Sequence, residues 1–298
     1  MHARGPGAGG SWLVGGFTVL KRHPWKIIGA AVLFALCMFV PIAIQFLLQQ
    51  VARPHGDAVM LTSLLASMLV FAAWYLILMG GFMRVIDADR NDRPVSAWMV
   101  LSPLQPRQGG LRLALFGIGM LVIYVAFLAA LLSTIGHGLL SWYLQLLDRQ
   151  TLGMPPQALP PFPAGAVASF ALLTVFFLFY AGAIAVGVGQ ASLRDQPPLS
   201  ALRDGIAGAF KNVLPLVVLA LCGLVTLFVV ALAFGVLGVI PILLGMWLSK
   251  SVGFVLLALL YIVLIILIYA FMMGVNYAMW HDVADGAVSG TPLTAAER

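Results

Sequence analysis

Carboxylates are the scarcest functional groups in this chain. Of its 10 acidic residues only Glu297, next to the last residue, is a glutamate, and none of the aspartates lies within an apolar run. A mechanism that needs a glutamate inside the membrane, or a pair of catalytic glutamates, is therefore excluded.

Charge of either sign is also rare. Only 9% of the residues are charged and 62% are hydrophobic, whereas about a quarter of the residues of a soluble domain are charged. The composition predicts a membrane protein. The net charge of +6 does not indicate nucleic acid as a partner, because the cations flank apolar runs and suit membrane orientation and anionic lipid better. Cys37 and Cys222 lie inside apolar segments and read as small hydrophobes.

Motifs that carry chemistry are missing as well. The five histidines are scattered without metal-ligand spacing, and the sequence has no zinc-protease motif, phosphate-binding loop, dinucleotide fingerprint or nucleophile elbow. We therefore predict no catalytic residue, no cofactor-binding residue and no metal site. His137, between two glycines near the end of an apolar run, is expected to be an exposed or hydrogen-bonded interfacial residue. Asp87, Asp89 and Asp92 alternate with arginines and are expected to form a self-neutralised loop.

Six apolar runs are long enough to cross a bilayer, which takes roughly 20 residues per helix. The prediction is an all-α, polytopic membrane helix bundle with six transmembrane helices and no soluble domain. Residues 1–10 are expected to be a disordered, Gly-rich tail, residues 11–285 a single transmembrane domain, and residues 286–298 a C-terminal tail. The crossings are predicted at about 25–49, 58–84, 111–135, 164–193, 213–235 and 252–280.

Two of the runs are too long for one crossing, since 37 residues of helix span roughly 55 Å against a core of about 30 Å. Breaks are predicted at Gly136–Gly138 and at Gly235–Pro241. Amphipathic interfacial helices are predicted near the start, with Trp12 at headgroup level, and over residues 199–213, where apolar residues recur at helical spacing.

A short pattern at the end of every second crossing predicts three diverged helix-pair repeats. A glycine is followed eight residues later by an aspartate that has a cationic residue or histidine beside it. Either these ends form a docking rim, or, as we favour, the aspartate leaves the membrane and helps to start the next interfacial helix. The glycine-rich stretch 182–189 favours close helix packing over an unwound substrate site. The pairs are Gly81 and Asp89, Gly187 and Asp195, and Gly274 and Asp282.

The distribution of Lys and Arg predicts the orientation. With this topology, thirteen of the 16 cationic residues lie on one side of the membrane, and the positive side is normally the cytoplasmic one. Both termini are therefore expected in the cytoplasm.

Cations also precede each odd-numbered crossing, which predicts an anionic-lipid-binding rim on the same side. The alternative is that these residues only set the topology. The six candidate lipid-binding residues are Arg22, Lys26, Arg107, Arg112, Arg203 and Lys211.

The segment from Gly10 to Pro24, GSWLVGGFTVLKRHP, resembles the opening of an uncharacterised family of proteobacterial integral membrane proteins. Those proteins begin with a Trp, a Gly-Phe or Gly-Trp pair, an apolar pair, basic residues and a Pro ahead of the first of several crossings. The resemblance implies a location in the bacterial inner membrane. It carries no activity and no functional residue.

These observations favour a non-enzymatic protein that organises the membrane or interacts with lipids, a membrane-protein partner or a second copy of itself. The alternative is a transporter or permease of a small or apolar solute. The scarcity of intramembrane ionisable groups counts against ion-coupled transport, whereas the repeats and Gly-broken helices favour transport.

Overall fold

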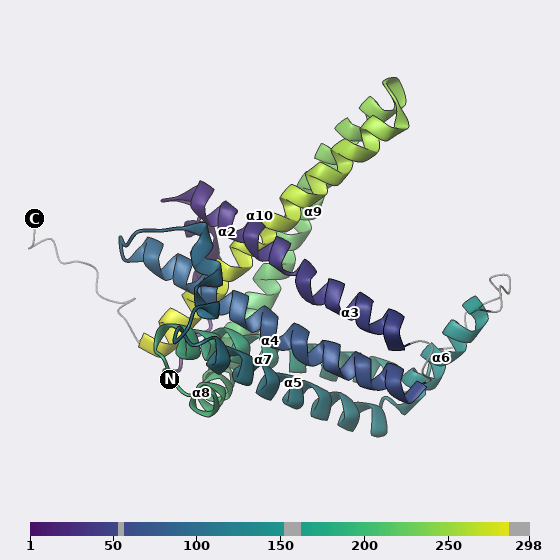
Figure 1. Ribbon diagram of the computed structural model, residues 1–298, viewed down its shortest axis with the longest axis horizontal. Helices are drawn as coiled ribbons and strands as arrows, with labels where there is room; N and C mark the ends of the chain where they lie inside the picture. The colour runs from purple at the N-terminus through teal and green to yellow at the C-terminus, as the bar shows by residue number, and fades with distance from the viewer. Residues whose placement is uncertain (53–56, 152–161, 286–298) are drawn as a thin grey trace, which may run out of the picture.

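The protein is all α-helical, and its long helices are apolar enough to cross a membrane. The computed structural model describes residues 1–52, 57–151 and 162–285 (Figure 1). Within these residues there is no strand, and six candidate spans are present, which confirms the predicted helical bundle with six crossings. The spans are Pro24–Gln50, Thr62–Arg90, Gly110–Ser133, Ala166–Leu193, Val213–Trp247 and Lys250–Ala284.

The helices are close to the predicted crossings but differ at their ends. The first span consists of two helices, since α2 ends just before Met38 and α3 begins just after it. The second span continues six residues beyond the predicted end at residue 84. The elements are α1 (Ala8–Thr18), α2 (Pro24–Cys37), α3 (Phe39–Ala52), α4 (Asp57–Arg90), the 3-10 helix η2 (Ala97–Leu104), α5 (Gly110–Ser133), α6 (His137–Thr151), α7 (Ala166–Leu193), α8 (Pro198–Lys211), α9 (Val213–Trp247) and α10 (Lys250–Asp285).

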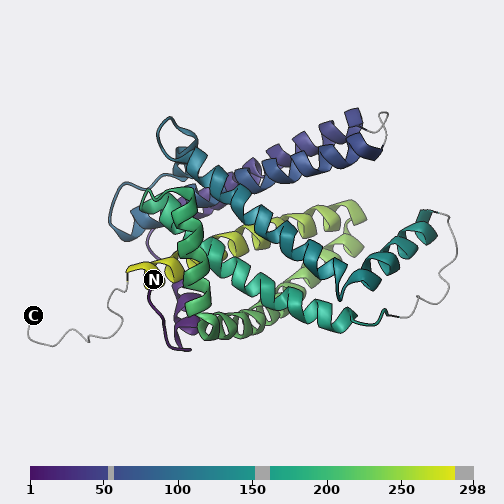
Figure 2. The same ribbon diagram turned by 90° about the horizontal axis from the view of Figure 1, so that it is seen from below.

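The long helices converge at one end of the molecule and separate toward the other. We call the first the polar end: α2, α5 and α9 begin there, and α4, α7 and α10 finish there. Figures 1 and 2 both place the N-terminus, α8 and the end of α10 at the left, where the helices meet. The α9–α10 hairpin points away from the other helices in Figure 1, and only 6% of the residues in its most apolar stretches are buried.

The hydrophobic core lies at the polar end, where α4, α7 and α10 pack against one another. Small residues on α7 permit this approach. An added Cβ atom at Gly187 would lie 2.4 Å from the ring of Phe116, and one at Gly189 would lie 2.1 Å from the ring of Trp280. The stretch 182–189 remains helical, which agrees with the predicted close packing.

Three short elements cover the polar ends of three helix pairs. η2 packs on α2 and α4, α8 packs on α5 and α7, and α1 packs on α9 and α10. Each short element contacts the glycine of the repeated pattern, with an added Cβ atom lying within 3.1 Å of its backbone. These contacts join Gly81 to Val100, Gly187 to Ala201, and Gly274 to Gly16.

The aspartates of the same pattern occupy different positions. Asp89 and Asp282 lie within their helices, whereas Asp195 follows the end of α7 with a positive φ of 54°. The backbone position with this conformation after α4 belongs to Asp92 instead. The three-fold repeat therefore stays a prediction that the packing of the glycines favours.

The two predicted helix breaks have different outcomes. The helix does break before α6. Gly136 lies close to the Leu131 carbonyl oxygen there, and His137 Nδ1 lies 3.0 Å from the Thr134 carbonyl oxygen. The break at Gly235–Pro241 was a wrong prediction, because α9 runs through Pro241 without interruption. Proline is tolerated inside membrane helices when its surroundings accommodate the freed carbonyl groups.

The first residues differ from the expected disordered tail. Residues 8–10 belong to α1, and His2 and Arg4 hydrogen-bond to α10. Trp12 is buried within the protein: only 2% of it is exposed, and its indole Nε1 donates to the Asp282 carboxylate at 2.9 Å. The helix predicted over 199–213 is present as α8, but it ends at Lys211, and Val213 begins α9. The small residues of α8 face α7, while Leu199 and Phe210 are exposed.

Candidate functional site

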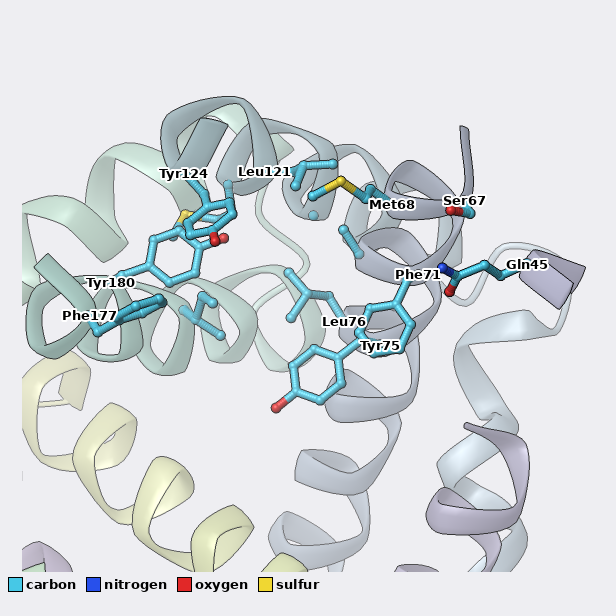
Figure 3. A pocket seen from close by; sticks show the side chains of 14 residues that line it. Gln45, Ser67, Met68, Phe71, Tyr75, Leu76, Leu121, Tyr124, Phe177 and Tyr180 are labelled. Carbon is cyan, nitrogen blue, oxygen red and sulfur yellow. The ribbon is translucent and has the colours of Figure 1, made fainter. Parts of the chain in front are cut away.

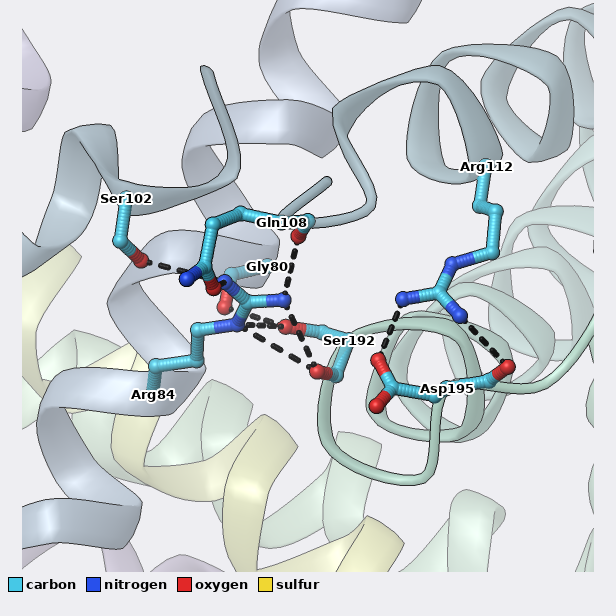
Figure 4. A network of polar contacts seen from close by, with 7 residues as sticks. All are labelled: Gly80, Arg84, Ser102, Gln108, Arg112, Ser192 and Asp195. Carbon is cyan, nitrogen blue, oxygen red and sulfur yellow. Dashed lines mark hydrogen bonds and ion pairs between the residues drawn. The ribbon is translucent and has the colours of Figure 1, made fainter. Parts of the chain in front are cut away.

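Arg84 is the hub of a polar network at the polar end. It lies in the last two turns of α4 and reaches α7 and the loop after η2 (Figure 4). Its Nε donates to the Ser192 carbonyl and hydroxyl oxygens at 3.3 and 3.2 Å, and Nη2 donates to the Gln108 carbonyl oxygen at 2.7 Å. Nη1 donates to Ser102 Oγ at 3.3 Å and Gln108 Oε1 at 3.2 Å. The planar guanidinium thereby joins three elements through neutral acceptors.

A second arginine closes the same corner from α5. Arg112 forms an ion pair with Asp195, and its Nη1 also donates to the Asp195 carbonyl oxygen at 2.6 Å. Its Nε is buried and has no hydrogen-bond partner in the part of the chain that the structure describes. The corner therefore holds the Arg84 and Arg112 guanidinium groups near a single carboxylate.

The repeated aspartates pair with distant residues rather than with their sequence neighbours. Asp89 is only 3% exposed, and its Oδ1 lies 2.6 Å from His23 Nδ1. Asp282 pairs with Arg4 at 2.8 Å, and the Asp195 partner is Arg112. Residues 87–92 were expected to neutralise one another, but only part of their pairing is local. Asp87 pairs with the nearby Arg93, whereas Asp92 pairs with Arg22, far away in the sequence.

Residues 1–4 contact the end of α8, Asn212 and the end of α10 at the polar end. The side chain of Asn212, 1% exposed, accepts from the Arg4 backbone N–H at 2.8 Å and donates to the His2 carbonyl oxygen at 3.0 Å. The Arg4 guanidinium donates to the Asp282 carbonyl oxygen at 2.7 Å. Since one amide clamps two backbone groups, this segment is held in a defined conformation.

The six candidate lipid-binding residues all lie at the polar end but differ in what they contact. Three of them make contacts within the protein: Arg22 with Asp92, Arg112 with Asp195, and Lys211 with the Met1 carbonyl oxygen at 3.2 Å. The other three are exposed, and the described residues offer them no ion pair. These three are Lys26, Arg107 and Arg203.

An apolar pocket lies between α4, α5 and α7, with α3 at its edge (Figure 3). Its volume is about 330 Å³, and every residue that lines it belongs to a candidate span. Figure 3 shows Gln45 and Ser67 at one end and the Tyr124 and Tyr180 rings, with centroids 6.1 Å apart, at the other. The rest of the lining is aliphatic, aromatic or Met, including Phe71 and Phe177.

The composition of the pocket decides which ligands suit it. No ionisable group except tyrosine lines it, so a charged solute would have no partner there. Its size falls in the range of small-molecule sites. The residues described also bring together no group of three potential metal ligands. The pocket suits an apolar molecule, or the apolar part of a lipid.

Comparison of the chain with protein-family profiles, with curated proteins and with solved structures finds no match.

Reasoning from the sequence missed both features. Arg84 was predicted to be the last residue of a crossing, with a polar loop after it, whereas the helix continues to Arg90. The pocket depends on contacts among four helices, and no local pattern reports those. One signal was present: Phe176, Phe177 and Tyr180 form an aromatic group on α7 at helical spacing.

Proposed function

We propose that the protein is a non-enzymatic, multi-pass membrane protein that binds membrane lipid and organises its surroundings or partner proteins through it. The observation that carries the proposal is the apolar pocket between α4, α5 and α7. Its whole lining lies in the candidate spans. The occupant is the hydrocarbon tail of a lipid.

The position of the pocket supports occupancy by lipid. It is open on one side, and its apolar lining belongs to the candidate spans, so it faces hydrocarbon rather than bulk water. Water does not fill apolar cavities, and lipid tails are the most abundant apolar molecules at this depth.

Transport of an apolar solute is the second candidate. The observation that favours it is the pair of tyrosines at one end of the pocket with Gln45 at the other, since a few polar groups orient a ligand in an apolar site. Binding near the middle of the bilayer is also typical of transporters.

Filling the pocket separates these functions from a packing defect. Ala72→Phe places a ring in the space, and Ala129→Phe, at an exposed residue of α5, is the matched control. Native mass spectrometry after graded delipidation should show that Ala72→Phe has lost at least one tightly held lipid, with Ala129→Phe unchanged. Equal lipid retention by all three proteins would contradict lipid binding in the pocket.

Thermal shifts with a panel of compounds extend the same experiment. If a water-soluble compound stabilises the parent protein but not Ala72→Phe, the pocket serves transport rather than lipid binding. If only lipids stabilise the parent, the lipid proposal stands.

We further propose that the polar end faces the cytoplasm of a bacterium, with the protein in its inner membrane. The excess of Lys and Arg at this end supports the orientation, and the resemblance of the first segment supports the location. Reporter fusions at Arg93 and Arg203 should be active with a cytoplasmic reporter, and a fusion at Lys250 with a periplasmic one. Alkaline phosphatase activity at Arg93 or Arg203 would reverse the topology.

A further inference from the structure

A second pocket lies at the polar end, between η2 and the start of α5. Its volume is about 630 Å³. Pro103, Leu104 and Gln105 form one side, the first residues of α5 form the other, and Ile77 of α4 contributes to the lining. Because α5 begins here, this η2–α5 pocket lies where a span leaves the hydrocarbon core.

The chemistry of the η2–α5 pocket is divided between two kinds of lining. Arg107 and Arg112 supply two guanidinium groups, and no carboxylate lines the pocket. Leu104 and Leu111 are 46% and 74% exposed, although both are large and apolar. Cations next to exposed leucines suit a ligand with an anionic head and an apolar body.

The charge around the η2–α5 pocket is not balanced within the protein. Arg84 hydrogen-bonds to the loop after η2, Arg107 belongs to that loop, and the Arg112 guanidinium lies beside Gly109 at its end. Asp195 is the one carboxylate that pairs with any of the three among the described residues. The Arg84 guanidinium donates its hydrogen bonds to neutral oxygens, and the Arg107 side chain is exposed. This corner therefore keeps an excess of positive charge, which an anionic ligand would complement.

We infer that the η2–α5 pocket binds the phosphodiester headgroup of an anionic membrane lipid through Arg107 and Arg112, with the lipid tails lying along Leu104 and Leu111. The inference rests on the proposed lipid-binding function and deepens it by assigning a headgroup site. It also separates the predicted lipid-binding cations by role. Arg107 binds only the headgroup, Arg112 binds both Asp195 and the headgroup, and Arg203 lies outside the site.

The test compares Arg107→Gln with Arg203→Gln. Both changes remove one exposed arginine at the polar end, but only Arg107 lines the pocket. Purified protein is titrated with phosphatidylglycerol and with phosphatidylcholine, and bound lipid is counted by native mass spectrometry. Arg107→Gln should weaken phosphatidylglycerol binding about fivefold and leave phosphatidylcholine binding unchanged. Arg203→Gln should leave both unchanged, and Arg107→Lys should restore part of the preference.

Each other outcome overturns the inference. If Arg107→Gln and Arg203→Gln weaken phosphatidylglycerol binding equally, the effect is the general field of the polar end. If neither matters, the η2–α5 pocket does not recognise the headgroup. If millimolar inorganic phosphate displaces the lipid from the parent protein, the site binds free phosphate rather than a lipid.

Failure of the inference is distinguishable from failure of the proposed function. A parent protein that retains no lipid of either kind contradicts the proposed function. A parent that retains lipid without preferring phosphatidylglycerol contradicts only the headgroup site. Unchanged melting temperatures of the Arg107 variants confirm that folding is intact, which is expected because the side chain is exposed.

Discussion

Gly81→Ala is expected to separate η2 from α4 and to cost at least about 3 kcal/mol of stability. An added Cβ atom would lie 1.9 Å from the Val100 carbonyl oxygen and 2.9 Å from the Val100 Cα. Both neighbours are backbone atoms, so no side-chain rotation relieves the overlap. Inserted methyl groups in packed cores typically cost about 1–3 kcal/mol, and this contact is at the severe end.

Gly223→Ala is the matched control for this change. It lies on α9, and nothing approaches within 4 Å of an added Cβ atom. Because alanine is the better helix former, we expect a neutral or slightly stabilising effect of up to about 1 kcal/mol. Thermal unfolding in detergent, followed by circular dichroism, measures both variants. A melting temperature of Gly81→Ala equal to that of the parent would show that η2 does not pack as described.

Arg84→Ala should be the most damaging replacement of a charged residue. The substitution removes the hydrogen bonds from the Arg84 side chain to α7 and to the loop after η2. It also leaves the Gln108 carbonyl oxygen without its donor. Hydrogen bonds to charged groups contribute about 1.5–3 kcal/mol each. Since such contributions are not additive, we expect a total loss on the order of 4 kcal/mol.

Two further variants show whether the shape of the guanidinium or its charge matters. Arg84→Lys keeps the charge but cannot reach Ser102, Gln108 and Ser192 together. We therefore expect its stability to lie between that of the parent and that of Arg84→Ala. Arg203→Ala removes an exposed arginine at the same end and should change stability by less than about 0.5 kcal/mol. Equal stability of Arg84→Lys and the parent would mean that charge alone suffices.

The six crossings were predictable because hydrocarbon imposes a length and a composition on any helix that spans it. The ends of the helices were less so. The apolar run stops at Arg84, but the helix continues to Arg90, since its last turns bury Val85, Ile86 and Ala88 in the protein core. The change from apolar to polar residues therefore does not mark the end of the helix here.

Pro241 and Trp12 show two other limits of pattern reasoning. Proline predicts a break from local sterics, yet α9 continues through Pro241, and its carbonyl oxygen lies close to Gly253 of α10. Trp12 resembles an interfacial anchor in sequence, but Asp282 offers its indole a half-buried partner 270 residues away. Both pockets depend on contacts of this long-range kind, so the sequence showed only the two arginines of the η2–α5 pocket and the aromatic residues on α7 beforehand.

The clamp on residues 2–4 ties the order of synthesis to the order of assembly. His2 and Arg4 leave the ribosome long before Asn212 and Asp282, the residues that hold them. Until the last hairpin has entered the bilayer, α1 has neither α9 nor α10 to pack on, and its Trp12 stays uncovered. The polar end consequently closes only after α10 has been made, and a chain interrupted before α10 would leave Trp12 without its Asp282 partner.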